Sequence, residues 1–67
     1  SAPEATFATI IVGQGEVHFV VHESLLTQRS KFFRAALTGR FKEDADKIVR
    51  LQDEEPSHFE FFVHWLY

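Results

Sequence analysis

Cysteine is absent from the 67 residues of this chain. Disulfide bonds and a zinc site built from thiolates are therefore excluded, and the redox compartment is left undetermined. A chain of this length forms one domain, residues 1–67, and buries only roughly 60% of the surface that its unfolded form exposes. Additional stabilisation has to come from somewhere other than a large core.

Long apolar runs and excess positive charge are also missing. No stretch approaches the ~20 apolar residues that cross a bilayer, and no charged and then apolar leader opens the sequence. Seven Lys and Arg residues are dispersed among ten Asp and Glu residues, for a formal net charge of −3, whereas nucleic acid binding depends on clustered basic residues. We expect an intracellular protein, nuclear or cytoplasmic, that binds neither membrane nor nucleic acid.

Aromatic side chains are plentiful by comparison. The chain has eight phenylalanines, together with Trp65 and Tyr67. Each ring buries a large area in a core or an interface, and this content exceeds what a small monomer can cover. The composition therefore predicts that part of the apolar surface is buried against another protein chain.

The first third of the chain has the pattern of a β-hairpin. Residues 1–6 are small and polar and predict a flexible start. Residues 7–12 are rich in β-branched side chains and apolar on both faces, as in a strand that is covered on each side. Gly13 and Gly15 supply positive φ at a turn, and residues 17–21 form the second, antiparallel strand.

At residues 21–33 the apolar period changes from that of a strand to that of a helix. A short helical turn is predicted from Ser24 to Arg29. Ser30 is then well placed to cap a second helix that runs to about Thr38. This change of period marks the point where the chain leaves the sheet and begins to cover it.

The second helix is predicted to pack on the hairpin through Phe33, Ala36 and Leu37, which share one face. Gly39 is expected to take the left-handed position after it. Residues 40–47 mix charges without a clear period and predict a solvated loop.

A brief third strand is predicted at residues 48–51, and a helix begins soon after it. Pro56 suits a first helical turn, and Ser57 with Glu60 has the spacing of a capping box. Glu55 and Ser57 both qualify as the N-cap, and the sequence does not choose between them.

The last helix has two apolar stripes. The stripe that is predicted to be core consists of Phe59, Phe62, Val63 and Leu66. Phe61 and Trp65 form the other, and nothing in the remaining chain is long enough to cover both. Phe61, Trp65 and Tyr67 are therefore predicted to contact further helices or another molecule.

Four histidines raise the alternative of a metal-dependent or catalytic domain. His18 and His22 lie too far apart on a strand for easy joint ligation, and His58 and His64 lie on different sides of a helix. No serine has the context of a nucleophile elbow, and helix capping explains the serines better. We predict no catalytic, cofactor-binding or metal-binding residues, and keep the histidine hypothesis as an alternative of another class.

A set of spaced residues carries a resemblance to a known family: His22, Leu26, Ser30, Phe32 and Phe33. Similar stretches follow at residues 35–43 and 59–67. In these residues the chain resembles a BTB/POZ domain, closest to those of filamentous fungi, from about residue 10 onward. The family's domain continues through further helices, so the resemblance implies the N-terminal part of that domain. Its fold signature here is His22, Leu26, Ser30 and Phe33.

The resemblance implies an α+β fold, in which a three-stranded sheet, made of the hairpin and the third strand, is flanked by helices. It implies a protein-interaction module rather than an enzyme, which forms homodimers or higher oligomers or acts as an adaptor for a cullin-based ubiquitin ligase. It also implies that His22 closes a strand and bonds to nearby backbone. The expected interface residues, on the hairpin and the last helix, are Phe7, Phe61, Trp65 and Tyr67.

Overall fold

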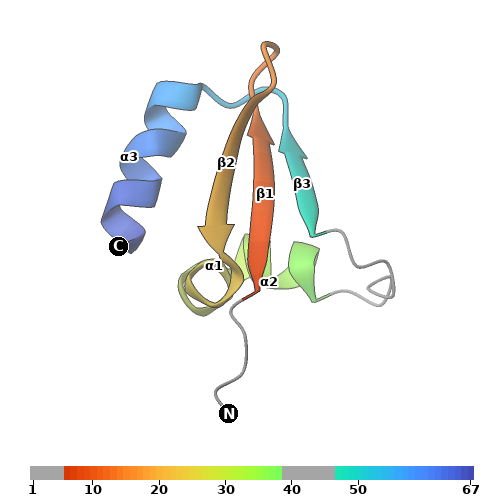
Figure 1. The fold of residues 1–67 in the computed structure, drawn as a ribbon, viewed down its shortest axis with the longest axis vertical. Coiled ribbons are helices and arrows are strands. Elements are labelled where there is room, and N and C mark those ends of the chain that lie inside the picture. Colours follow the sequence, from red (N-terminus) through yellow and green to blue (C-terminus); the bar gives the residue numbers. More distant parts are fainter. Residues whose placement is uncertain (1–5, 39–46) are drawn as a thin grey trace.

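The computed structural model describes residues 6–38 and 47–67. Figure 1 shows three strands and three helices. In chain order they are β1 (Phe7–Val12), β2 (Val17–His22), α1 (Glu23–Arg29), α2 (Lys31–Leu37), β3 (Ile48–Leu51) and α3 (Pro56–Leu66). This arrangement confirms the predicted α+β class, with a three-stranded sheet made of a hairpin and a third strand.

The sheet has the strand order β2-β1-β3, so the first strand lies in the centre. The hairpin partners β1 and β2 are antiparallel, and Thr9 lies opposite Val20. In contrast, β3 runs parallel to β1, and Thr9 lies opposite Ile48. Parallel neighbours need a crossover connection, and the segment that contains α1 and α2 supplies it.

The hairpin turn depends on one glycine of the two that were predicted. Gly13 has a φ of 82°, whereas the second positive φ, 58°, belongs to Glu16 rather than to Gly15. A side chain at position 13 would place its Cβ 3.1 Å from Cγ of Pro56. The turn therefore packs directly against the start of α3, and only a residue without Cβ fits there without strain.

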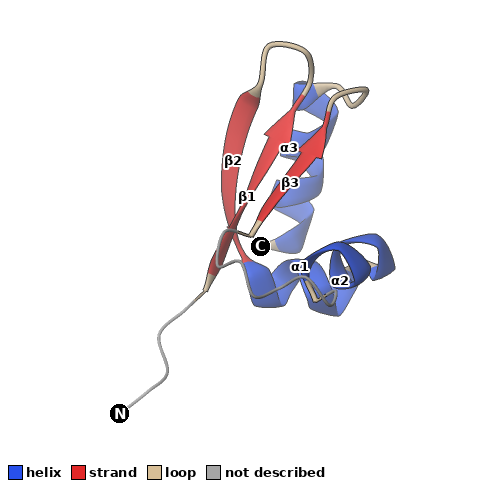
Figure 2. Ribbon diagram, turned by 90° about the vertical axis from the view of Figure 1, so that its right-hand side faces the viewer, coloured by secondary structure: helices blue, strands red, loops and turns tan. Residues whose placement is uncertain are grey.

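The three helices within residues 6–38 and 47–67 lie on one face of the sheet. Figure 2 shows α1, α2 and α3 on the same side of the strands. The core on that side consists of Ala8, Ile10, Val12, Val21, Leu26, Phe33, Leu37, Phe59 and Leu66. Side chains alternate along a strand, so Phe7, Thr9 and Ile11 point to the opposite face, where no described helix lies. The prediction that this strand is covered on each side is therefore wrong; Ile11 is 5% exposed because His18 and Arg50 flank it in neighbouring strands.

Three serines were interpreted as helix caps, and the structure confirms Ser30 as the N-cap of α2. Its Oγ accepts a hydrogen bond from the N–H of Phe33, at 3.2 Å, at the start of α2. Ser24 lies inside α1, which begins one residue earlier at Glu23 and follows His22 as its N-cap. For α3, Glu55 is the N-cap with no side-chain hydrogen bond, and Ser57 lies within the first turn. The capping interpretation is therefore wrong for Ser24 and Ser57.

The predicted apolar face of α2 is correct for two of its three residues. Phe33 and Leu37 are each 4% exposed, but Ala36 is exposed. Ala36 lies at the edge of the buried face, where no described element packs on it. Thr38 ends the helix, and its N–H donates to the carbonyl of Arg34 at 3.0 Å.

Several predictions fall on residues outside the described ranges. They are the left-handed Gly39, the loop at residues 40–46 and most of the flexible start at residues 1–6. The last residue of that start, Thr6, accepts a hydrogen bond at its carbonyl from the N–H of Glu23, at 2.8 Å. Within residues 6–38 and 47–67, no helix has the length and apolar character needed to cross a bilayer.

Candidate interaction surface

The four predicted interface residues lie on the surface in two groups. Phe61 and Trp65 are on the outward side of α3, 77% and 60% exposed. Phe7, on the uncovered sheet face, lies beside the ring of His22 with centroids 4.6 Å apart, and Tyr67 lies on the same imidazole at 5.7 Å. The structure therefore links Phe7 to Tyr67 through His22, and it places both rings at the end of β2.

Tyr67 makes an unpredicted contact with His22. Its hydroxyl accepts a hydrogen bond from the backbone N–H of His22, at 3.1 Å, and lies 2.6 Å from Nδ1 of the same residue. The expectation that the His22 side chain bonds to nearby backbone is therefore wrong. Its partner is a side chain 45 residues away, which no local pattern in the sequence could indicate.

Aromatic rings of α3 stack on one another and on a ring of α2, and together they form a row of stacked rings. Phe62 stacks on Phe33, with centroids 6.1 Å apart and planes 21° apart, and on Trp65, at 5.9 Å and 25°. The guanidinium of Arg29, at the end of α1, lies over the Trp65 ring, 5.2 Å from its centroid. A cation over an aromatic face is attracted to it, so Arg29 joins the surface although the sequence did not single it out.

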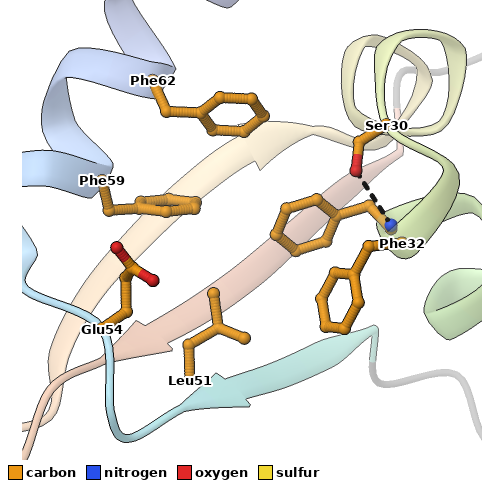
Figure 3. A pocket seen from close by; sticks show the side chains of 7 residues that line it. Ser30, Phe32, Leu51, Glu54, Phe59 and Phe62 are labelled. Atoms are coloured by element: carbon orange, nitrogen blue, oxygen red, sulfur yellow. Dashed lines mark hydrogen bonds between the residues drawn. The ribbon is translucent and has the colours of Figure 1, made fainter.

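An open apolar cavity of about 370 Å³ adjoins this row of stacked rings. Its lining residues are Ser30, Phe32, Phe33, Leu51, Glu54, Phe59 and Phe62. Figure 3 shows Phe59 and Phe62 projecting from α3, Leu51 from the end of β3 and Glu54 from the connection between them. Glu54 is the one charged residue among these seven, so a carboxylate stands beside a surface made mostly of rings.

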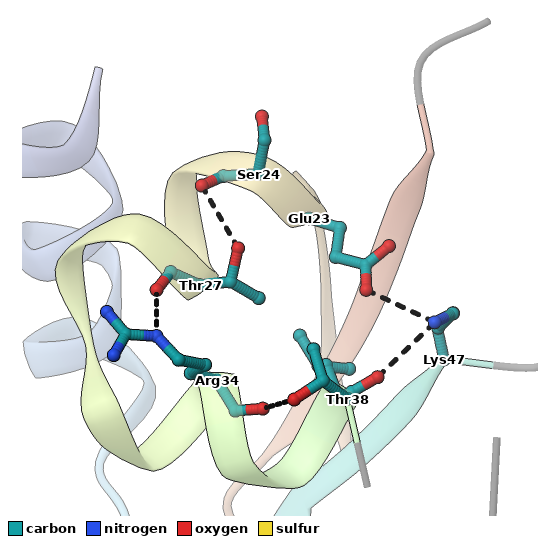
Figure 4. A network of polar contacts seen from close by, with 7 residues as sticks. Glu23, Ser24, Thr27, Arg34, Thr38 and Lys47 are labelled. Atoms are coloured by element: carbon teal, nitrogen blue, oxygen red, sulfur yellow. Dashed lines mark hydrogen bonds and ion pairs between the residues drawn. The ribbon is translucent and has the colours of Figure 1, made fainter.

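A polar network on another side of the molecule ties the crossover segment to the sheet (Figure 4). Nζ of Lys47 donates to Oε2 of Glu23 at 3.2 Å and to the carbonyl of Leu37 at 3.3 Å. On the neighbouring turn, Nε of Arg34 donates to the carbonyl of Thr27 at 3.0 Å. The Lys47 bonds hold α1 and α2 close to the start of β3, and the Arg34 bond joins α2 to α1.

The histidines are not brought together. His18, His58 and His64 are exposed, and His22 is engaged with Tyr67. Among the residues that the structure describes, no three His, Cys, Asp or Glu side chains are grouped to hold a metal ion.

The BTB/POZ domain family matches residues 3–67, nearly the whole chain. The chain belongs to the BTB/POZ family. That family is one of protein-interaction domains and is not catalytic. The exposed rings of Phe61, Trp65 and Tyr67 therefore belong to a domain family whose members bind other proteins.

The relatives of this BTB/POZ chain are longer, multidomain proteins. Kelch repeat and BTB domain-containing protein 4 of Homo sapiens and of Mus musculus is 31% identical over 64 residues, which are 96% of this chain and 12% of the relative. BTB and MATH domain-containing protein 15 of Caenorhabditis elegans is 33% identical over 64 residues, 96% of this chain and 23% of the relative. No solved structure gives a significant match. These relatives are animal proteins, so they do not confirm the predicted fungal type.

Proposed function

We propose that this BTB/POZ chain self-associates, as a homodimer or a higher oligomer, and recruits partner proteins through its exposed apolar surface. The supporting observation is the number of large apolar side chains that the described residues leave 42–77% exposed. They are Phe7, Val17, Val20, Phe32, Ile48, Phe61, Trp65 and Tyr67. Large exposed apolar patches on a folded domain mark sites of protein interaction.

The energetics require that several of these side chains be buried together. Burying one exposed ring such as Phe61 or Trp65 contributes about 2 kcal/mol, whereas association costs about 4–15 kcal/mol in lost freedom of motion. A single ring therefore cannot hold two chains together. A continuous surface with several anchors is needed, and α3 with its neighbours offers one.

The oligomeric state in solution tests this proposal. Sedimentation velocity of the purified chain, at concentrations from about 1 to about 100 µM, covers the range of weak to moderate interfaces. We expect a species heavier than the 7.8 kDa chain that grows with concentration. A monomer at every concentration would contradict the proposal.

An adaptor role toward a cullin scaffold is a second candidate. It is favoured by the relatives, whose names join a BTB domain to Kelch repeats or to a MATH domain. Binding to the N-terminal domain of a purified cullin, measured by biolayer interferometry, tests it. Saturable binding that Phe61→Ala weakens supports the role, and no binding at about 100 µM, a very weak affinity, counts against it.

A further inference from the structure

We draw no further inference here: the strongest candidate, the open apolar cavity that α2, the end of β3 and α3 line, with Glu54 among its lining residues, carries nothing because nothing in the structure shows what covers it.

Discussion

Tyr67 and His22 are joined by two hydrogen bonds that share a single hydroxyl group. The hydroxyl oxygen accepts from the backbone N–H of His22 at 3.1 Å and lies 2.6 Å from Nδ1 of the same residue, where the imidazole tautomer sets which group donates. The end of β2 is thereby attached to the residue that follows α3.

Tyr67→Phe is predicted to lower the free energy of unfolding by at most about 1 kcal/mol, because the ring stays while two solvent-exposed hydrogen bonds are lost. Urea unfolding followed by circular dichroism measures the change. If Tyr67 acts mainly in an interface, the variant would instead weaken association and leave the unfolding of the monomer unchanged.

Phe33 is a buried aromatic residue that is surrounded by other rings. It is 4% exposed and lies within 6.2 Å, between centroids, of Phe32, Phe59 and Phe62. Phe33→Ala is predicted to cost about 3–5 kcal/mol through lost burial and an unfilled cavity, which few small domains tolerate. Thermal unfolding measures it. Phe32→Ala, one residue away and 56% exposed, is the control and should cost far less.

At the scale of elements, Ser30 is both the C-cap of α1 and the N-cap of α2. The N–H of Ser30 donates to the carbonyl of Leu26 at 3.0 Å, while its Oγ caps the next helix. Each of these helices has only seven residues. Helices this short are not stable alone in water, so they depend on the cap and on the packing of Leu26 and Phe33 against the sheet.

Ser30→Ala is predicted to destabilise the fold by about 1 kcal/mol, the usual cost of removing an N-cap side chain. Ser24→Ala, inside α1, should be nearly neutral, because the Ser24 side chain caps no helix. Chemical denaturation of the two variants in parallel provides the comparison. Equal losses in both would contradict the assignment of Ser30 as the cap.

The hairpin turn permits a similar comparison. Gly13→Ala is predicted to cost more than about 1 kcal/mol, because φ is positive there and the new methyl group meets Pro56. Gly15→Ala places its Cβ where no atom lies within 4 Å and should be close to neutral. Thermal unfolding midpoints of the two variants decide this. A larger loss at Gly15 would mean that the turn is not built as described.

At the scale of the whole molecule, the helices cover one face of the sheet and leave rings on the outside of α3. A ligand or partner that binds only the folded state raises its apparent stability, and a second copy of the chain acts in the same way. If folding and association are coupled, the unfolding temperature should rise with protein concentration. Scanning calorimetry at several concentrations measures this, and Phe61→Ala should show a smaller dependence.

The order and bounds of the elements could be predicted because they depend on local patterns. β-branched residues marked β1 at the residues where it occurs, and the spacing of Phe59 and Leu66 marked the buried side of α3. The exposure of Phe61 and Trp65 followed from the same helical periodicity. Their role in an interface stays a prediction.

The sequence by itself determined the α+β class, the strands and helices, and the surplus of aromatic side chains, because each follows from composition or from spacing over a few residues. Only the tertiary structure decided which sheet face is covered, that Tyr67 binds His22, and that Arg29 lies over Trp65. These features depend on contacts between segments far apart in the chain, and such contacts leave no local period in the sequence.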